Sequence, residues 1–223
     1  MISRVIELGA YTRLTTLKFK RIKNTSFIKL EEAEELRVFS ELAYRNIGVR
    51  FPIHFLQNSK TFAVLNQRGN ICGGFVLAPA GHSRVIDSLP EEGMQILLDN
   101  FPTYKDTMFE ITGLWLCRSQ RSKTLAVRFW TKLYKEVCRM KRSHFIFAYS
   151  SKKAKLGEIY SVVKPKRIFK GYTKMMPGMI EPDDEVIEVG SVKMAHLAWV
   201  TQLSFLYKRL VRGRSKCKRV VYH

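Results

Sequence analysis

The chain has 223 residues, 46% of them hydrophobic, which excludes an intrinsically disordered protein and fits one large domain or one domain with an extension. No apolar run approaches the roughly 20 residues that a bilayer-spanning helix needs, and the N-terminus lacks the apolar core of a secretion signal. The 39 Lys and Arg residues against 19 Asp and Glu give a net charge of +20, which favours a polyanionic partner: nucleic acid, a ribosome, an anionic membrane surface or the phosphates of a cofactor.

The positive charge is concentrated in particular segments. Residues 118–175 hold seventeen basic residues and two acidic ones, and residues 193–223 hold eight basic residues and no acidic one. Residues 176–192, in contrast, hold five acidic residues and no basic one. Because lysines that only keep a chain soluble would be spread evenly, this segregation favours contact with nucleic acid or nucleoprotein.

The cysteines and histidines show no metal-ligand spacing, and we predict no metal site. The cysteines form no Cys-x-x-Cys pair and are interpreted as reduced thiols of a cytoplasmic protein. The residues are Cys72, Cys117, Cys138 and Cys217, and His54, His82, His144, His196 and His223.

The first predicted helix spans residues 30–46, where apolar side chains recur at helical spacing and glutamates crowd the first turns. The positive end of the helix dipole favours acidic side chains there, and Gly48 is a residue type that commonly ends a helix. Residues 51–55, which include Pro52, are predicted to form a loop or short turn.

A β-hairpin is predicted at residues 60–79, with its turn at residues 67–70. Its second strand contains Gly73 and Gly74, and such paired glycines indicate a bulge or a close backbone approach by a ligand. Residues 79–84 are predicted to form a loop.

The rest of the chain alternates helices and strands, which predicts an α/β fold with mixed strand directions. The predicted elements are a short helix at 89–100, a strand at 109–117, a helix at 125–142, a strand at 143–150, a helix or helical turn at 151–163, strands at 167–172 and 186–189, and a last helix at 192–211. The predicted divisions are a basic N-terminal segment at 1–29, one domain at 30–190, and a C-terminal helix with a basic tail at 191–223.

The stretch from Phe109 to Tyr134 carries the predicted site. A buried strand is followed by residues 118–124, which include no apolar side chain, and then by a helix with a broad apolar side. Free backbone N–H groups at the positive end of that helix suit a phosphate. An ordinary β–α turn with solvated charges would have the same composition.

Within this stretch, Arg121-Ser122-Lys123-Thr124-Leu125-Ala126 resembles the Gln/Arg-x-x-Gly-x-Gly/Ala pyrophosphate loop of the GCN5-related N-acetyltransferase (GNAT) superfamily, with Thr124 where the family usually has glycine. The order of elements over about residues 28–175 is also similar to that family. The resemblance implies a mixed, mostly antiparallel sheet flanked by helices, an acyltransferase-like activity, and acyl-CoA or acetyl-CoA as cofactor. The residues that it implies for cofactor binding are Leu116, Arg118, Arg121, Ser122, Lys123, Thr124, Leu125 and Ala126.

Two catalytic roles follow from the same resemblance. Glu110, eleven residues before Arg121, is similar in position to the family's general-base glutamate. Tyr160, in Gly157-Glu158-Ile159-Tyr160, resembles the tyrosine that protonates the departing thiolate. The alternatives are a strand-end carboxylate paired with a nearby cation, and a core tyrosine with a satisfied hydroxyl group.

A narrower resemblance, over roughly residues 60–175, is to the phage Mom-type DNA modification proteins, which are small, basic and GNAT-like and alter adenine in DNA. Tyr149-Ser150-Ser151, the segment ending at Tyr160, and Gly171 are similar to a Tyr-Ala/Ser-Asp…Gly-x-Ile-Tyr…Gly pattern. Ser151 stands where that group has an aspartate, and Gly113 where it tends to have an arginine. The resemblance implies a DNA partner, a host cytoplasm if the protein is phage-encoded, and a catalytic site that adds Tyr149 and Ser151 to the two residues above.

Two other functions stay open. One is an acyl-CoA-dependent N-acyltransferase that acts on a protein or a small amine. The other is a non-catalytic nucleic-acid-binding protein on the same fold, which Thr124 and Ser151 would suit. A catalytic GNAT protein should be stabilised by acyl-CoA, a DNA modifier should change the mass of a nucleoside, and a binding protein should bind DNA with a steep salt dependence.

Overall fold

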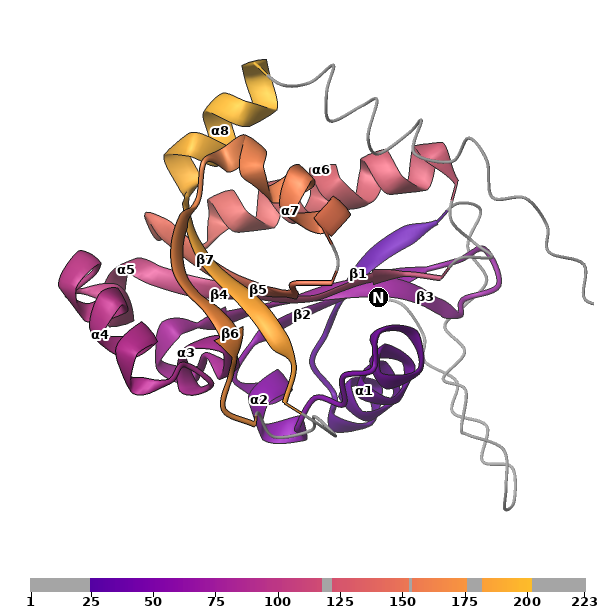
Figure 1. Cartoon of the computed structure of the whole chain (residues 1–223). Helices are drawn as coiled ribbons and strands as arrows, with labels where there is room; N and C mark the ends of the chain where they lie inside the picture. The colour runs from indigo at the N-terminus through magenta and orange to yellow at the C-terminus, as the bar shows by residue number, and fades with distance from the viewer. Residues whose placement is uncertain (1–24, 118–121, 153, 176–181, 202–223) are drawn as a thin grey trace, which may run out of the picture.

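A seven-stranded sheet with the strand order β1-β2-β3-β4-β5-β7-β6 forms the centre of the molecule (Figure 1). The structure, a computed structural model, describes residues 25–117, 122–152, 154–175 and 182–201. The strands are β1 (Ser26–Leu30), β2 (Lys60–Leu65), β3 (Ile71–Pro79), β4 (Met108–Leu116), β5 (His144–Ser150), β6 (Lys166–Tyr172) and β7 (Asp184–Ser191).

Helices cover both faces of this sheet. The helices are α1 (Ala33–Ile47), α2 (Ile53–Gln57), α3 (Arg84–Asp87), α4 (Glu91–Asn100), α5 (Tyr104–Thr107), α6 (Lys123–Arg139), α7 (Ala154–Tyr160) and α8 (Val192–Thr201), with 3₁₀ turns η1 (Ala80–His82) and η3 (Ser161–Val163). In Figure 1, α6, α7 and α8 lie on one face, α1 and α2 on the other, and α4 and α5 at one end.

The sheet is mixed. Within the described strands, β4 and β5 are parallel and every other neighbouring pair is antiparallel. The predicted fold class, a mostly antiparallel sheet flanked by helices with a helix near the C-terminus, is therefore confirmed.

The start and end of α1 follow from its sequence. The Glu35 carboxylate accepts hydrogen bonds from the backbone N–H groups of Glu31 (3.2 Å) and Glu32 (3.3 Å), which satisfies donors that the helix leaves unpaired. Gly48 ends the helix at a φ of +78°, a conformation that favours glycine, and its N–H donates to the Tyr44 carbonyl group.

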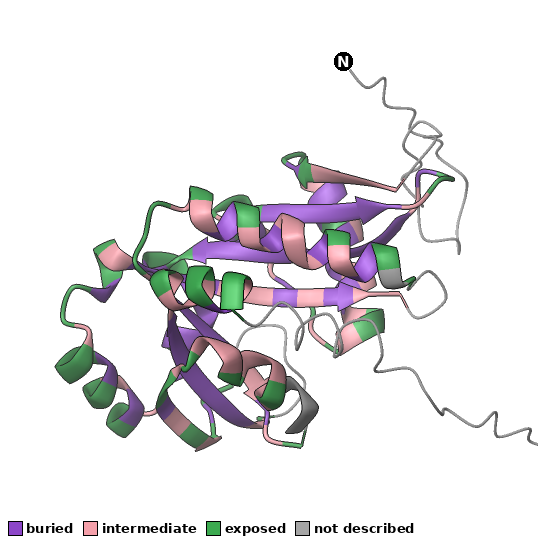
Figure 2. Ribbon diagram, turned by 90° about the horizontal axis from the view of Figure 1, so that it is seen from above, coloured by how far each residue is buried: buried purple, intermediate pink, exposed green. Residues whose placement is uncertain are grey.

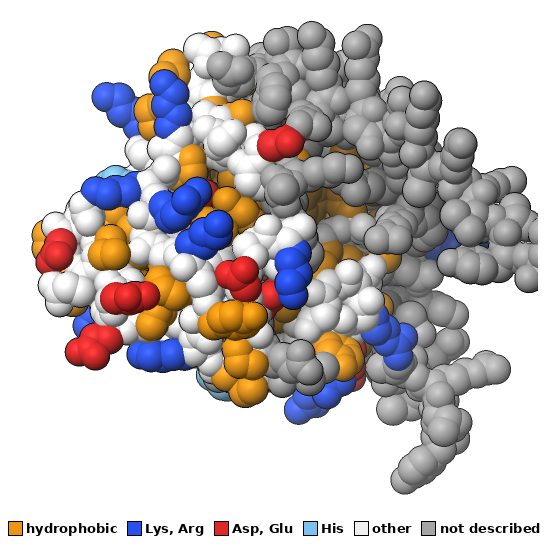
Figure 3. Space-filling view, in the orientation of Figure 1, with side chains coloured by type: hydrophobic (Ala, Val, Ile, Leu, Met, Phe, Trp, Pro, Cys, Tyr) orange, Lys and Arg blue, Asp and Glu red, His pale blue; other side chains and the backbone are white. Residues whose placement is uncertain are grey.

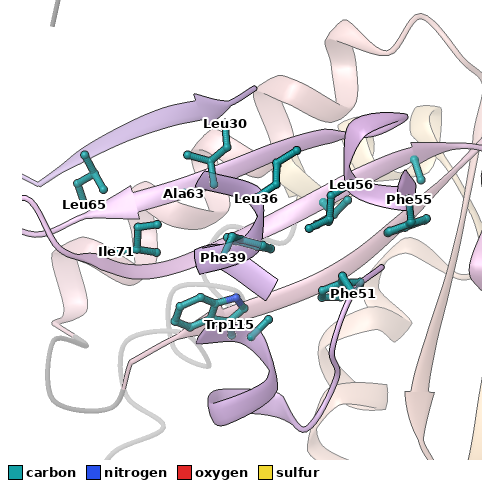
Figure 4. Packing of buried hydrophobic residues seen from close by; sticks show 13 residues of the cluster. Leu30, Leu36, Phe39, Phe51, Phe55, Leu56, Ala63, Leu65, Ile71 and Trp115 are labelled. Atoms are coloured by element: carbon teal, nitrogen blue, oxygen red, sulfur yellow. The ribbon is translucent and has the colours of Figure 1, made fainter. Parts of the chain in front are cut away.

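Separate hydrophobic clusters fill the two faces of the sheet. Under α1 and α2, aromatic and aliphatic side chains such as Phe39, Phe51 and Trp115 form one cluster (Figure 4). On the other face, Phe75, Phe129 and other side chains pack between the sheet and α6. Figure 2, which looks down on the molecule, shows that the central strands are mostly buried while the outer sides of the helices are exposed.

Several short elements differ from the sequence prediction: η1 and α3 include residues of the predicted loop at 79–84, and α5 was not predicted. The strand β1 and the helix α2 also bear on the predicted boundaries. β1 pairs with β2 from Ser26 to Leu30, so the predicted boundary at residue 29 falls inside a strand of the sheet. Residues 53–57 form the helix α2 where a loop or turn was predicted. Both elements are short, and they are held by contacts to distant parts of the chain rather than by a local periodicity.

Close packing explains why glycine occupies positions 73 and 74. A Cβ atom on Gly73 would lie 2.5 Å from Leu116, and one on Gly74 would lie 2.4 Å from the Phe39 ring. The pairing of β3 with its neighbours is also irregular here, which agrees with the predicted bulge. The close approach that these glycines permit is to other parts of the protein, including the carbonyl oxygens of Trp115 and Phe62.

The remaining structural expectations concern metals, thiols and membranes. Among the described residues, no three His, Cys, Asp or Glu side chains come together as metal ligands would. Cys72, Cys117 and Cys138 are free thiols, and Cys217 lies outside the described ranges. None of the helices in the described ranges is long and apolar enough to cross a membrane.

Candidate active site

β4 and β5 separate after a short stretch of pairing. Both strands lie within the described residues, and their parallel pairing covers three residue pairs. It ends where Glu110 lies opposite Ile146. Beyond that point β4 continues along β3 to Leu116, and β5 continues along β7 to Ser150. Each strand therefore keeps one partner and turns the backbone groups of its other edge toward the gap, where a ligand can reach them.

A β-bulge in β4 lies at the point of separation. The register between β3 and β4 shifts between Gly74 and Val76, so that β4 carries one extra residue. Gly113 takes up the extra length with a φ of +62°. A Cβ atom there would lie 3.0 Å from the Phe51 ring. Because a bulge bends its strand, this glycine helps to turn β4 away from β5.

The gap is open as a cleft with a volume of about 560 Å³. It is lined by the separated halves of β4 and β5, by the segment between α1 and α2, by the start of α3, by Tyr160 of α7 and by residues at the start of β7. This volume is within the range of small-molecule sites.

Three charged side chains meet beside the cleft. Arg84 of α3, Glu110 of β4 and Glu185 of β7 are 6%, 0% and 8% exposed. The Arg84 guanidinium group lies over the rings of Phe51 and Phe55, 5.0 and 5.5 Å from their centroids. Burial lowers the pKa of Arg84, and the two carboxylates act in the opposite direction. The cluster therefore balances one buried cation against two acids.

Glu110, the predicted general base, is held on the inner side of this cluster. Its Oε2 accepts hydrogen bonds from the Ser83 hydroxyl group (2.7 Å) and the Val85 N–H group (3.1 Å). Burial raises the pKa of Glu110, while Ser83, Val85, Arg84 and Thr112 each oppose that rise. Glu110 is not one of the described residues that line the cleft, although Arg84 and Val85, which surround it, are.

Glu185 does line the cleft. Burial and the neighbouring Asp183 raise the pKa of this carboxyl group to about 7, against the opposing effects of Thr173 and Arg84. The Thr173 hydroxyl group lies 3.5 Å from Glu185 Oε2. A carboxyl group with such a pKa can accept a proton at neutral pH.

Tyr149 and Tyr160, two of the predicted site residues, lie together in the cleft. Their ring centroids are 5.5 Å apart, and Phe147 lies 4.7 Å from Tyr160. Burial and the proximity of Tyr149 raise the pKa of Tyr160 to about 12. Burial and Glu188 raise the pKa of Tyr149. Both phenols therefore stay protonated at neutral pH and can donate hydrogen bonds.

Ser151 is held outside the cleft lining, at the end of β5. Its hydroxyl group donates to Asp184 Oδ2 (2.5 Å), and its N–H group donates to the Asp184 carbonyl group (2.8 Å). These bonds join the end of β5 to the start of β7. Its predicted catalytic role stays a prediction.

The predicted cofactor loop is described only in part. Arg118 and Arg121 lie outside the described residues. Ser122 caps α6, because its hydroxyl oxygen accepts a hydrogen bond from the Leu125 N–H group at 3.0 Å. The backbone N–H groups at Lys123 and Thr124 have no acceptor within the helix, as at every helix start.

The other predicted cofactor residues have packing roles. Leu125 and Ala126 are 5% and 2% exposed and face the core under α6. Leu116 ends β4 and lies against Gly73 of the neighbouring strand. Any contact that these three residues make with a cofactor would be through backbone atoms or exposed edges.

Comparisons with known proteins give the fold. No protein-family model matches the chain, and no curated protein matches it. Among solved structures, the N-acyl amino acid synthase FeeM from uncultured soil microbes is similar with a TM-score of 0.58 and 13% identity over 81% of this chain and 98% of that one. The chain has the fold of the GNAT acyltransferases.

Two further structures support that assignment. Arabidopsis thaliana NAA60, solved in complex with acetyl-CoA, is similar with a TM-score of 0.53 and 11% identity over 76% of this chain and 99% of that one. The spermidine/spermine N-acetyltransferase SpeG from Vibrio cholerae is similar with a TM-score of 0.50 and 11% identity over 79% and 99%. At these identities the likeness establishes the fold.

The sequence analysis missed two residues of this site. Glu185 belongs to the acidic segment 176–192, just before the strand predicted at residues 186–189, and Arg84 belongs to a segment predicted to be a loop. The sequence feature that could have pointed to Glu185 is its position in the acidic segment 176–192, which interrupts the otherwise basic second half of the chain. No pattern around Arg84 distinguishes it from a surface arginine, because its burial depends on Phe51 and Phe55.

Proposed function

We propose that this chain is an acyl-CoA-dependent N-acyltransferase that acts on an amine. The observation that carries the proposal is the cleft between the separated strands, which Glu185 and Tyr160 line as a proton acceptor and a hydrogen-bond donor. Similar solved structures include an N-acyl amino acid synthase and a spermidine/spermine N-acetyltransferase, whose acceptors are amines.

The residues of the cleft fit an acyl-CoA molecule. The free edges of β4 and β5 offer N–H and C=O groups to the amide groups of the pantetheine arm. The start of α6 offers N–H groups at Lys123 and Thr124 to the pyrophosphate, beside the capping residue Ser122. When bound, acyl-CoA supplies an acyl group activated as a thioester.

The chain's own residues then have defined tasks. A bond forms between the amine nitrogen and the acyl carbon, the carbon–sulfur bond breaks, and the proton of the amine passes to Glu185. Tyr160 donates a hydrogen bond to the departing sulfur. Because a thiol has a pKa of about 8.5 and the pKa of Tyr160 is about 12, the phenol stabilises the thiolate and keeps its own proton.

Glu110 is the base that the sequence predicts, and it remains a candidate. Two observations favour Glu185 over it: Glu185 lines the cleft, and its carboxyl group has a pKa of about 7. Glu110 is fully buried and already accepts two hydrogen bonds, so its proposed contribution is to hold α3 and Arg84 in place.

The test is an acylation assay on the full chain with acetyl-CoA and longer acyl-CoA donors, offered a panel of primary amines, amino acids and peptides. Thiol release and product mass are followed together. Glu185→Gln should lower turnover far more than acyl-CoA affinity, and Glu110→Gln should do so only if Glu110 is the base. Glu136→Gln is the matched control, because Glu136 is a buried carboxylate on α6 that pairs with Lys132 and Arg139. Thiol release without acylation of any amine contradicts the proposal.

A second candidate function is modification of adenine in DNA by a Mom-type transferase. The aromatic pair Tyr149 and Tyr160 in the cleft and the net charge of +20 favour it, since a flipped base stacks on aromatic side chains. Against it, Gly113 stands at the arginine position of that group, where its φ of +62° and the Phe51 ring disfavour a side chain.

The distribution of charge also bears on whether the chain acts on DNA. More than half of the net positive charge belongs to residues that the structure does not describe. On the face drawn in Figure 3, basic and acidic side chains of the described residues are interspersed. Nucleoside mass spectrometry on DNA from expressing cells, beside a Tyr160→Phe variant, tests this function. An unchanged profile removes it, and salt-dependent DNA binding without any transfer would favour the non-catalytic alternative.

A further inference from the structure

A second cavity is lined by residues of β4, β5, α6, α7, η3 and α8. These helices cover the face of the sheet opposite α1 (Figure 1). Its volume is about 120 Å³. Two elements that form its outer wall pack through an aromatic stack: the rings of Tyr134 on α6 and Trp199 on α8 lie 4.9 Å apart at an angle of 8°.

The lining of this cavity is apolar. Among the described residues that line it, none carries a charge or an amide group, and the polar atoms of its side chains are confined to aromatic residues. The hydroxyl group of Tyr134 is hydrogen-bonded to His196, so it is satisfied outside the cavity. This pocket is about as open as the cleft, and its apolar lining favours hydrocarbon, as the binding of benzene in an enclosed engineered cavity of about 150 Å³ illustrates.

The cavity adjoins the cleft. Four residues line both spaces: Ile111 and Leu114 on β4, Phe147 on β5 and Tyr160 on α7. Leu114 follows the bulge at Gly113, and Ile111 and Phe147 lie on the two strands just after they separate. A group that enters the cleft between the strands therefore meets the cavity at Tyr160, the residue proposed to contact the departing sulfur.

We infer that this cavity binds the hydrocarbon chain of the acyl donor, so that the preferred donor carries a medium-length acyl chain rather than acetyl. The inference rests on the proposed function and names its donor. With a volume of about four-fifths of a cavity that holds benzene, the space takes roughly five carbons beyond the thioester carbonyl group.

The experiment measures the affinity of the full chain for acetyl-, butyryl-, hexanoyl-, octanoyl- and dodecanoyl-CoA by calorimetry. Burial of one methylene group is worth about 0.8 kcal/mol, which is about a fourfold gain in affinity. The dissociation constant should fall about fourfold per added carbon up to hexanoyl-CoA and then level off. Equal affinities, tightest binding of acetyl-CoA, or no binding of any donor overturns the inference.

Paired variants localise the effect to the cavity. Ala195→Phe places a ring in the cavity and should abolish the gain in affinity from acetyl- to hexanoyl-CoA. Val162→Ala, in η3, enlarges the cavity and should move the optimum to a longer chain. Leu197→Phe is the control, because Leu197 lies on α8 outside the cavity and is 51% exposed. An unchanged chain-length profile in folded Ala195→Phe and in Val162→Ala contradicts the inference.

The assay of transfer separates the two proposals. If amines are acylated but the affinity does not depend on chain length, the proposed function stands and the acyl cavity is wrong. If the affinity rises with chain length and responds to Ala195→Phe but no amine is acylated, the cavity is real and the proposed function is wrong.

Discussion

The two faces of the sheet are packed in different ways. Under α1 and α2, Phe39 is fully buried, its ring lies 6.5 Å from that of Phe51 and 6.0 Å from that of Trp115, and Gly74 lets it approach the strand. On the opposite face, side chains of α6 also pack on the strands, but an apolar pocket of about 120 Å³ is left between the strands, α6 and α8. Because protein interiors are normally close-packed, this pocket beside the cleft is the space that we propose a ligand fills.

The same contrast holds for the charged groups. Most acidic side chains of α1 lie on its surface or pair locally, for example Glu34 with Arg37. At the cleft, by comparison, Arg84, Glu110 and Glu185 are buried together. The buried charges thus gather beside the gap between β4 and β5, where we propose that the reaction takes place, and their burial costs stability.

The largest expected effect is on catalysis at the cleft. Glu185→Gln should lower the acylation rate about 10²- to 10⁴-fold, the usual contribution of a general base. In the wild-type protein the rate should rise with pH through about 7, where Glu185 loses its proton, and the variant should lack that rise. A pH–rate profile of both proteins measures this. If Glu185→Gln keeps the wild-type pH–rate profile, another residue is the general base.

A substitution in the close-packed cluster under α1 and α2 should change stability rather than catalysis. Phe39→Ala removes a fully buried ring and should lower the free energy of unfolding by about 3–5 kcal/mol, because the close-packed site cannot collapse around the void. Denaturant unfolding measures the loss. The rate per folded molecule should stay near that of the wild type. A loss below about 1 kcal/mol would mean that this face is also loosely packed.

Glu185 should also lower the stability of the wild-type protein as pH rises. Its pKa is raised from about 4.3 in an unfolded chain to about 7 in the folded one, so the folded state holds the proton longer. The stabilisation by that proton is complete below the unfolded pKa and is lost as pH rises through about 7. Relative to the wild type, Glu185→Gln should therefore gain up to about 3 kcal/mol between pH 4 and pH 8. Thermal unfolding at both pH values tests this, and a gain that does not depend on pH contradicts it.

The smallest expected effect comes from the bulge. Gly113→Ala puts a side chain at a φ of +62° and brings a Cβ atom to 3.0 Å from Phe51, which should cost about 1–2 kcal/mol of stability. It should also weaken acyl-CoA binding, because the bulge separates β4 from β5. Gly81→Ala is the control, since nothing lies within 4 Å of a Cβ atom there. Equal effects of both substitutions would show that the bulge has no special role.

Local patterns predicted much of the fold. The periodicity of residues 30–46, the hairpin at residues 60–79 and the short apolar run at residues 143–150 each correspond to an element of the structure. Periodicity and turn residues act over a few positions, so they can be read along the chain. α2 was predicted to be a loop or turn because its stability comes from the cluster around Phe51. β1 lies at the end of a segment whose sequence is strand-like or irregular, and its pairing with β2 makes it a strand.

The candidate site was predictable only in part. The tyrosines at 149 and 160 were identified through a resemblance, and the structure places their rings 5.5 Å apart. Glu185 and Arg84 were not identified, because their environment is made by residues far away in the chain. The pKa of a carboxyl group depends on burial and on neighbouring charges, and neither follows from its local sequence.

By itself, the sequence determined the class of the protein: a folded α/β chain with a strong positive charge, an amphipathic first helix and a β-hairpin with paired glycines. The tertiary structure decided where β4 and β5 separate, which of two glutamates faces the resulting cleft, and that an apolar cavity adjoins it. The physical reason is range: periodicity, capping and charge are properties of neighbouring residues, whereas a cleft, a cavity and a shifted pKa arise only when distant segments pack together.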